Sequence, residues 1–483
     1  MMGNKNILLI YPSQWYSSEW GQYLCMKPQL LSIFSYLEYK GYNVNLIDLE
    51  LEIGRPKNEE EIYTFKKRAL DLISKYDFEI VGISCLTSLN YLSSITVAKI
   101  CKNINKQSIV IVGGYHPSAI PEDFIFKSSP FDYVVKGEGE LKLAELCVKK
   151  RDRFLSSPIV LKGEPLPLED NFRFDWPSYP YIDIYKKNKN IDFPLNLSRG
   201  CPFSCVYCME KTKMITGWRS FSVKKALKEI EKIVHILNPK QISFVEPCFG
   251  ASKKWRRHFL KSLIELKVDC IFWANTRIDL MEEEDIDLFS QLNFHLEFGI
   301  ETFSKKMLRI MKKTNNPKNY LHKCQSILNH SSLRELFICS NFMFNYPGET
   351  KSTINETLYF LRFLINKIKR PSFLINGQNY AFFPSFDLLK NINWYRQNYG
   401  TEVKYVDWWK KNGDYQKLSR EIIPSRDLSK GKDFWMLKFQ ELGSFLLSRL
   451  SPRIKLLLWA QVHDLKTHDF WNSKNLVDVL HLI

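Results

Sequence analysis

The chain has 483 residues, more than one ordinary hydrophobic core accommodates, so we expect two or three domains. Its composition, 45% hydrophobic and 25% charged, is typical of a globular protein and excludes collagen-like, coiled-coil and low-complexity chains. Lys and Arg number 69 against 52 Asp and Glu, which gives a net charge of +17.

The basic excess lies after residue 150. Residues 1–150 carry 17 basic and 17 acidic side chains, whereas 151–389 carry 36 and 25, and 390–483 carry 16 and 10. A field of this sign favours an acidic substrate, an acidic protein partner, nucleic acid or an anionic membrane surface. No nucleic-acid-binding module is recognisable, so we do not expect nucleic acid as a partner. A lysine-rich solvated surface without a partner is the alternative.

Nothing in the sequence indicates export or a membrane span. The first apolar run, residues 7–10, is too short for a signal peptide, and no 18 consecutive residues are apolar. The cysteine count of eleven is odd, and eight cysteines stand among apolar neighbours, which predicts buried thiols in a reducing compartment. We therefore expect a cytoplasmic protein. These eight are Cys25, Cys85, Cys101, Cys147, Cys248, Cys270, Cys324 and Cys339.

The first 150 residues alternate strand and helix patterns. Continuous Ile, Val and Leu runs near 6–12, 42–49, 79–85, 108–114 and 132–136 are separated by amphipathic stretches. This alternation predicts a doubly wound α/β domain, Rossmann-like or flavodoxin-like, with a parallel sheet covered on both faces. Ligands of such sheets bind beyond the carboxyl ends of the strands. Several glycines stand at those ends, namely Gly82, Gly113, Gly114, Gly137 and Gly139.

A proline-rich segment, residues 151–192, predicts a linker between two domains. A second alternating series follows over 193–389, with strands expected near 193–198, 241–246, 270–276, 294–301, 337–345 and 373–383. Six strand–helix units in this length favour a partial (β/α)6 barrel, whose chemistry belongs at the carboxyl ends of its strands.

From residue 390 to 483 the pattern is helical, rich in tryptophan and without strands. We expect a helical C-terminal cap over the barrel mouth, with its tryptophans mostly in the core. A basic amphipathic surface for a membrane or a partner is the alternative. The tryptophans are Trp394, Trp408, Trp409, Trp435, Trp459 and Trp471.

Cys201, Cys205 and Cys208 directly follow the first barrel strand, in the spacing C-x-x-x-C-x-x-C. A structural zinc site takes four ligands, and no fourth Cys or His lies nearby in the sequence. Three thiolates that hold a [4Fe–4S] cluster leave one iron open for a substrate or cofactor. A zinc site with a distant fourth ligand, and chance clustering of buried cysteines, stay open as alternatives.

In this motif the chain resembles the radical S-adenosylmethionine (SAM) superfamily. The resemblance implies that the amino and carboxylate groups of SAM bind the open iron, and that the reduced cluster cleaves SAM to a 5′-deoxyadenosyl radical. It also implies SAM contacts at strand ends, which could instead be ion-paired barrel residues or, for "PGET", a helix start. The candidates are Tyr207, Glu246 in "VEP" where the family has Gly-Gly-Glu, Arg277 in "NTRID", Glu301 in "GIET", and Gly348 and Glu349 in "PGET".

The front domain is similar to the cobalamin-binding domain that precedes the barrel in one subgroup of that superfamily. The similarity rests on "VGISCLTS", "VIVGGYHPSAIPE" and "DYVVKGEGE". No D-x-H-x-x-G motif is present, so we expect base-off cobalamin without a histidine as lower cobalt ligand. His116 would then pack beside the corrin or its tail, unless it is a turn residue without ligand contact. The residues that the resemblance assigns to cobalamin are Ser84, Gly113, Gly114, His116, Gly137 and Glu138.

The two resemblances together imply a cobalamin-dependent radical SAM methyltransferase of class B type. In that chemistry one SAM methylates cobalt, a second SAM yields the radical, and the substrate radical takes the methyl group from methylcobalamin. We expect the acceptor to be an unactivated carbon, or a phosphorus, of a specialised metabolite or peptide, with an anionic group favoured by the basic charge. A flavodoxin or ferredoxin-type protein would supply electrons. We assign no catalytic acid or base.

Two alternatives stay open. The same cofactors could drive a rearrangement, cyclisation or ring contraction without methyl transfer. The chain could also be a non-catalytic Fe–S scaffold protein.

Overall fold

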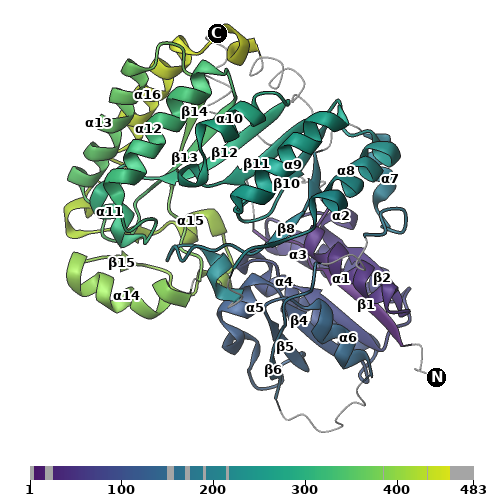
Figure 1. The fold of residues 1–483 in the computed structure, drawn as a ribbon. Coiled ribbons are helices and arrows are strands. Elements are labelled where there is room, and N and C mark those ends of the chain that lie inside the picture. Colours follow the sequence, from purple (N-terminus) through teal and green to yellow (C-terminus); the bar gives the residue numbers. More distant parts are fainter. Residues whose placement is uncertain are drawn as a thin grey trace.

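The computed structural model describes residues 5–16, 26–148, 157–168, 174–188, 192–213, 217–384, 386–431 and 433–456. It contains a front α/β domain, a partial barrel and a C-terminal segment packed against both (Figure 1). The expected doubly wound sheet and six-stranded partial barrel are confirmed. No helix among the described residues is long and apolar enough to cross a membrane.

The front sheet is parallel, with strand order β2-β1-β3-β4-β5-β6. Successive side chains of a strand point to opposite faces. On β1, Ile7 and Leu9 accordingly pack in the cluster with α1 and α6, and Leu8 and Ile10 in the cluster with α3 and α4. The strands are β1 (Asn6–Tyr11), β2 (Asn43–Asp48), β3 (Ile80–Ser84), β4 (Ile109–Gly113), β5 (Tyr133–Lys136) and β6 (Ile159–Lys162). The helices are α1 (Pro28–Tyr39), α2 (Leu49–Glu52), α3 (Glu59–Ile73), η1 (Ser88–Asn90), α4 (Tyr91–Ile104), α5 (Tyr115–Ala119), η2 (Pro121–Phe124) and α6 (Glu140–Val148).

The front sheet extends beyond residue 150. Strand β6 lies in the segment expected to be only a linker, and it pairs in parallel with β5 from Tyr133↔Ile159 to Lys136↔Lys162. Alternation of apolar residues is weak in this strand, which is largely exposed because it forms the sheet edge. The same segment also contains α7 (Ile182–Lys187).

The barrel sheet is also parallel, in the order β14-β13-β12-β11-β10-β7, so β7 and β14 are its two edges. Its strands are β7 (Phe193–Leu195), β10 (Gln241–Phe244), β11 (Ile271–Thr276), β12 (Phe294–Glu301), β13 (Ile338–Phe344) and β14 (Phe373–Asn379). Its outer helices are α8 (Val223–Leu237), α9 (Lys253–Leu266), α10 (Glu283–Phe289), α11 (Lys305–Ile310), α12 (Pro317–Leu333) and α13 (Lys351–Lys367). Shorter elements are β8 (Ser198–Arg199), η3 (Met209–Lys213), β9 (Arg219–Ser220) and η4 (Ile278–Leu280).

The C-terminal segment is mainly helical, but the expectation that it lacks strands is wrong. Strands β15 (Glu402–Val403) and β16 (Ile422–Ile423) form a small antiparallel pair, too short for a periodic sequence signal. The other elements are α14 (Phe386–Tyr399), η5 (Trp408–Lys410), α15 (Tyr415–Ser419), η6 (Arg426–Leu428) and α16 (Met436–Arg449).

The expected buried residues are largely confirmed. Seven of the eight scattered cysteines are buried, and Cys25 lies outside the described residues. Trp408, Trp409 and Trp435 are buried, whereas Trp394 is 48% exposed. Trp459 and Trp471 lie outside the described residues.

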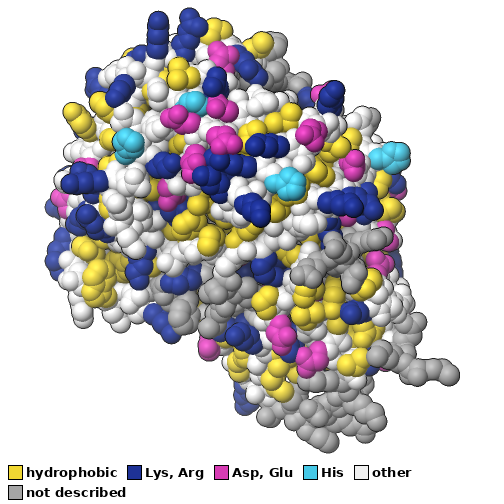
Figure 2. All heavy atoms as spheres, viewed as in Figure 1, with side chains coloured by type: hydrophobic (Ala, Val, Ile, Leu, Met, Phe, Trp, Pro, Cys, Tyr) yellow, Lys and Arg dark blue, Asp and Glu magenta, His cyan; other side chains and the backbone are white. Residues whose placement is uncertain are grey.

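Basic side chains do not form one patch on the face shown in Figure 2. Lys and Arg lie there among Asp and Glu over the barrel helices, and hydrophobic side chains are scattered between them. On this face, the basic excess of the sequence is therefore distributed.

Trp409 connects the C-terminal segment to the front domain. Its indole Nε1 donates to Asp123 Oδ2 at 2.7 Å, and its ring lies 5.3 Å from that of His116. Lys410 Nζ reaches the other oxygen of Asp123. The segment is thus fixed to the front domain by a contact between two residues that are 286 positions apart in the chain.

We expect Trp409→Ala to lower the free energy of unfolding by roughly 3–5 kcal/mol, because it leaves a cavity and removes a hydrogen bond to Asp123. The half-exposed Trp394→Ala serves as the matched control and should cost less than about 1.5 kcal/mol. Urea unfolding followed by circular dichroism measures both, and equal losses would contradict this role of Trp409.

Candidate functional site

The three motif cysteines lie on one loop between β8 and η3. Arg277, at the end of β11, donates from Nη1 to Cys205 Sγ at 3.3 Å, and its guanidinium lies 3.8 Å from the centroid of the Phe203 ring. Arg277 is held in turn by Asp279 and by the carbonyl of Lys313. A buried cation at this position suits a sulfur that would carry negative charge as an iron ligand.

The other two thiols differ in their surroundings. A hydrogen bond from the Cys248 thiol lowers the pKa of Cys201 to about 7 against the effect of burial. Burial, together with smaller contributions from the neighbouring thiols Cys205 and Cys201, raises the pKa of Cys208 to about 12. The three sulfurs are therefore close enough to interact. The described residues contain no group of three His, Cys, Asp or Glu placed around a single metal ion. A four-iron cluster needs no such group, because each thiolate binds a different iron.

Tyr207 and Glu301 meet where the resemblance places SAM. The Tyr207 hydroxyl donates to Glu301 Oε1 at 3.1 Å, and Lys313 Nζ lies 3.3 Å from the same oxygen. Glu301 has a left-handed φ of 71° at an irregularity in the pairing of β12 with β13. This conformation is costly for a non-glycine residue and is concentrated at functional sites.

Glu246 follows β10 and is fully buried. Its Oε1 accepts from the Ser198 hydroxyl at 3.1 Å, whereas Oε2 has no partner among the described residues. Burial raises the pKa of Glu246 from its usual 4.5 to about 8. An unsatisfied buried carboxyl of this kind fits a site that a cationic ligand group completes, as the amino group of SAM would.

Gly348 and Glu349 line neither of the two cavities described below. Gly348 has φ +89°, and its N–H donates to Pro424 O at 2.8 Å. Glu349 is buried, and its Oε2 accepts from the backbone N–H of Asn345, which closes the turn before α13, whereas its Oε1 has no partner among the described residues. Thr350 caps that helix, as the helix-start alternative predicted. In the described structure these two residues shape a turn against the C-terminal segment.

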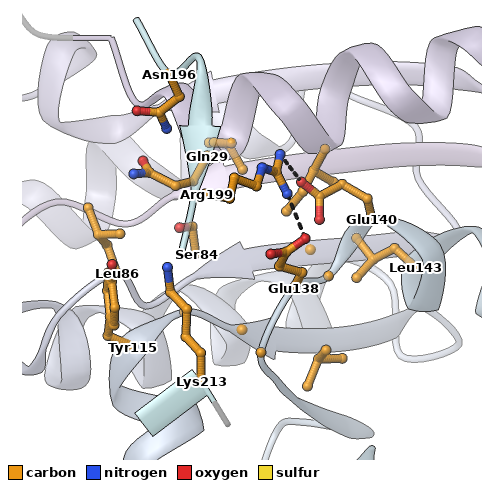
Figure 3. Close-up of a pocket in the computed structure, with 18 of the residues that line it drawn as sticks. Gln29, Ser84, Leu86, Tyr115, Glu138, Glu140, Leu143, Asn196, Arg199 and Lys213 are labelled. Atoms are coloured by element: carbon orange, nitrogen blue, oxygen red, sulfur yellow. Dashed lines mark hydrogen bonds and ion pairs between the residues drawn. The ribbon is translucent and has the colours of Figure 1, made fainter. Parts of the chain in front are cut away.

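A cavity lies at the carboxyl ends of the front-domain strands and encloses about 1050 Å³, part of it open to solvent. Figure 3 shows that residues of the barrel close it from the other side. A side chain at Gly114 would place Cβ 2.2 Å from the carbonyl oxygen of Cys85, and its φ is +125°. Glycine is therefore required there, and the edge stays open for a flat ligand. The predicted residues that line the cavity are Ser84, Gly113, Gly114, Gly137 and Glu138.

Glu138 does not offer a free carboxylate to this cavity. Arg199 Nη1 donates to its Oε2 at 2.9 Å, and Arg219 bonds its Oε1. Arg199 also bonds Glu140 at 2.8 Å (Figure 3). The Arg199 side chain stands two residues before Cys201, so the "GEGE" loop of the front domain fixes the start of the cysteine loop. Glu138 thus lines the cavity and also positions the cysteine loop, and its contact with cobalamin stays a prediction.

His116 does not line the cavity. It is completely buried, with Nδ1 2.7 Å from the Ser88 hydroxyl and Nε2 3.3 Å from Asp123. Burial lowers the pKa of His116, which favours the neutral ring. Both ring nitrogens are engaged, and the residue belongs to the contact with Trp409 described above.

The cysteine loop and the front cavity are in direct contact through η3. Tyr115, at the start of α5, donates to Glu210, and Lys213 lies 4.3 Å from the Tyr115 ring centroid. In Figure 3 Lys213 extends from η3 into the cavity toward Ser84. The ends of one short helix therefore face the cysteines on one side and the cavity on the other.

Comparison with known proteins supports this arrangement. The B12 binding domain family model matches residues 23–147, and the Radical SAM superfamily model matches residues 195–361. An uncharacterized methyltransferase of Pyrococcus horikoshii is 29% identical over 305 residues, which cover 60% of this chain and 65% of that protein. The matched region thus spans just under two thirds of that relative.

Two further proteins match more of the chain. The anaerobic magnesium-protoporphyrin IX monomethyl ester cyclase of Rubrivivax gelatinosus is 24% identical, over 91% of this chain and 80% of its own. The structure of the radical S-adenosylmethionine methyltransferase TsrM from Kitasatospora setae, with cobalamin and a [4Fe–4S] cluster bound, covers 93% of this chain and 90% of that one, with a TM-score of 0.66 at 14% identity. The likeness to TsrM shows a shared fold.

Sequence reasoning missed residues of both sites. Arg199 stands beside the motif in "SRGC", and that position was the available signal. Lys313 carries no motif, and only the fold brings it to Glu301. Asn196 and Lys213 line the front cavity from the barrel side, which no pattern within the front domain could indicate.

We expect Glu138→Gln to lower the free energy of unfolding by roughly 3 kcal/mol, because two arginines lose a buried carboxylate. Iron and cobalamin bound per chain should fall together after anaerobic reconstitution, since one network positions both sites. Glu284→Gln, at an exposed ion pair, is the control and should change stability by less than about 0.5 kcal/mol. Loss of one cofactor with full retention of the other would contradict the shared positioning.

The raised pKa of Glu246 predicts that the free energy of unfolding depends on pH. With a pKa of about 8 the folded, cofactor-free protein keeps a proton that the unfolded chain releases near pH 4.5, so stability falls as pH rises between these values. Glu246→Gln does not titrate. Its free energy of unfolding relative to the wild type should therefore increase by about 2 kcal/mol between pH 5.5 and 7.5. Urea unfolding at both pH values measures this difference, and Glu231→Gln, at an exposed position, is the control. The prediction fails if the two variants change equally relative to the wild type between these pH values.

Proposed function

We propose that this chain, which belongs to the cobalamin-dependent radical SAM enzymes, methylates an unactivated carbon or a phosphorus of a specialised metabolite or peptide. The observation that carries the proposal is the junction at η3, where the loop of three cysteines leads directly to the cavity of the B12-binding domain. A methyl group and a radical centre would be supplied on either side of this junction.

The residues of the chain have distinct parts in this chemistry. Cys201, Cys205 and Cys208 would hold the cluster, and Arg277 would stabilise the Cys205 thiolate. Tyr207 would bind one end of SAM, with Glu301 and Lys313 fixing its hydroxyl. When bound, the cluster supplies the electron that cleaves SAM and the cobalamin supplies a transferable methyl group.

Glu246 would receive the amino group of SAM. Its unpaired Oε2 and raised pKa mean that an arriving cation would be accompanied by release of the proton of the carboxyl. The Ser198 hydroxyl keeps the other oxygen in place.

The cobalamin would be bound base-off without a histidine below cobalt. Among the described residues, the lining of the front cavity includes no histidine, and both nitrogens of His116 are engaged elsewhere. The nucleotide tail would then lie in the front domain, away from the metal.

Electrons would come from a flavodoxin or ferredoxin-type protein in the cytoplasm. The net charge of +17 suits an acidic donor, and the unpaired thiols of the described cysteines suit a reducing compartment.

A reaction without methyl transfer is the second candidate, favoured by the Rubrivivax relative, whose name describes a cyclase and which matches 91% of this chain. The products distinguish the two candidates. Methylation releases both S-adenosylhomocysteine and 5′-deoxyadenosine, whereas cyclisation or rearrangement releases no S-adenosylhomocysteine.

We expect protein purified anaerobically with cobalamin and reconstituted with iron to show absorption from both corrin and cluster. With dithionite, [methyl-13C]SAM and an extract of the source organism, it should form both SAM products and a compound heavier by one labelled methyl group. Mass spectrometry follows all three. 5′-Deoxyadenosine without any labelled compound would favour the cyclase candidate.

In the same assay, Cys205→Ala should reduce 5′-deoxyadenosine to the detection limit, because it removes a cluster ligand. Cys101→Ala, which truncates a buried thiol of α4 far from the motif in sequence, is the matched control and should retain the reaction. If the wild type forms no 5′-deoxyadenosine and Cys205→Ala only lowers the free energy of unfolding, the chain would be a scaffold protein instead.

A further inference from the structure

A second cavity lies at the barrel mouth and encloses about 1400 Å³, part of it open to solvent. Three regions of the chain form its wall. Tyr207 and Glu301 come from the SAM end of the barrel, Gln14 from the loop after β1, and Tyr415 and Arg420 from the C-terminal segment. The cavity therefore borders the candidate SAM residues, the B12-binding domain and the C-terminal segment together, a position suited to a substrate that meets both cofactors.

The acidic side chains of this wall are already compensated. Glu297 accepts from Trp273 Nε1 at 3.2 Å and from the amide of Asn341. Glu301 accepts from Tyr207 and pairs with Lys313. Neither carboxylate is left to attract a cationic ligand.

Arg420 is different, because no carboxylate of the described residues lies within ion-pair distance of it. Its side chain is half-buried, and the one side-chain partner that the described structure gives it is Gln416 Oε1, at 3.4 Å from Nη1. Its Nε is buried without a partner. A partly buried guanidinium in a cavity wall without a counter-charge is unfavourable, and an anionic ligand would compensate it.

The backbone around Arg420 is fixed. Its N–H donates to Lys417 O at 3.1 Å, and its carbonyl accepts from Ile422 N at 2.9 Å, at the start of β16. Phe382 N donates to Ser419 O at 2.8 Å, which ties this turn to the chain after β14. The guanidinium is therefore presented from a rigid turn, as a preorganised binding group is.

Amide side chains make up much of the remaining polar wall. The side-chain amide of Asn376 donates to Asn341 Oδ1 at 3.0 Å, and the side-chain amide of Asn341 donates to Glu297. The donors of this ladder therefore all point toward Glu297, which leaves the side-chain oxygen of Asn376 available to a ligand. Amides both donate and accept, and they suit ligand amide or hydroxyl groups. The amide residues of the wall are Gln14, Asn341, Asn376, Gln378, Asn379 and Gln416.

We propose that this cavity binds a small substrate bearing a carboxylate or phosphate, with Arg420 as the anion-binding residue and the Asn376–Asn341 ladder contacting its amide or hydroxyl groups. The proposal rests on the proposed function, since it takes the cavity to be the substrate site of that reaction. Arg420 binds the substrate and takes no part in SAM cleavage.

The test uses the reconstituted full-length holoenzyme with [methyl-13C]SAM and an extract of the source organism that has been divided on an anion exchanger. Labelled product should arise from the retained fraction. Arg420→Met should then raise KM for that fraction by roughly 10- to 100-fold, as expected for the loss of a charged hydrogen bond. Arg420→Lys should restore part of the loss. Treatment of the active fraction with phosphatase distinguishes a phosphate from a carboxylate.

Lys417→Met is the matched control, since this exposed lysine precedes Arg420 by one helical turn, outside the cavity wall. Its KM should equal that of the wild type. Substrate-free formation of 5′-deoxyadenosine should be the same in all variants, as should the electron paramagnetic resonance spectrum of the reduced cluster.

Labelled product from the unretained or solvent-extractable fraction would overturn the proposal, as would equal KM values for Arg420→Met and Lys417→Met. Loss of substrate-free SAM cleavage in Arg420→Met would place the residue at SAM instead and also overturn it. Absence of labelled product from the wild type in every fraction would instead contradict the proposed methyl transfer.

Discussion

The arrangement of the two cofactor sites depends on the ion network of Arg199 with Glu138 and Glu140. Burying these charges has a large desolvation cost, which only close, hydrogen-bonded pairing offsets. Glu140 is completely buried, and the arginine beside it holds the pKa of its carboxyl below the usual value despite that burial. Separating the front domain from the barrel would leave these charges unpaired, so the pairing fixes the orientation of the two domains more firmly than apolar contact alone would.

This constraint explains why the B12-binding cavity and the cysteine loop are neighbours. Arg199 is tied to the front domain, and Cys201 follows it by two residues, so the loop cannot move far from the "GEGE" turn. At its other end the loop continues into η3, which is attached to α5 through Tyr115 and Glu210. The loop is thereby anchored at both ends to the domain that would bind cobalamin. A group transfer between two large cofactors requires such fixed proximity, because small displacements of reacting groups slow reactions strongly.

Much of this architecture could be predicted from the sequence. Continuous apolar runs separated by amphipathic stretches located the strands of both parallel sheets. The cysteine spacing identified the loop, and the glycines at strand ends identified the front cavity. Single side chains were less predictable. His116 and Glu138 stand in motifs that suggest ligand contact, yet tertiary partners occupy their polar atoms. Gly348 and Glu349 lie in a turn that the C-terminal segment covers, although the side-chain Oε1 of Glu349 has no partner among the described residues. Local patterns do not report such long-range partners.

The C-terminal segment shows where sequence reasoning stops for a physical reason. Its tryptophans predicted a packed cap, and Trp408 and Trp409 do fill the interface with the front domain. The residue that gives the second cavity its charge, Arg420, lies in no motif and between two elements of only five and two residues. Its particular feature is its position: among the described residues it has no carboxylate partner, and it stands in a cavity wall whose own carboxylates are satisfied. This property exists only once the three regions are packed together. The specificity of the enzyme for its substrate would therefore reside in the segment whose sequence is least informative, while the reactive chemistry resides in the loop whose sequence is most informative.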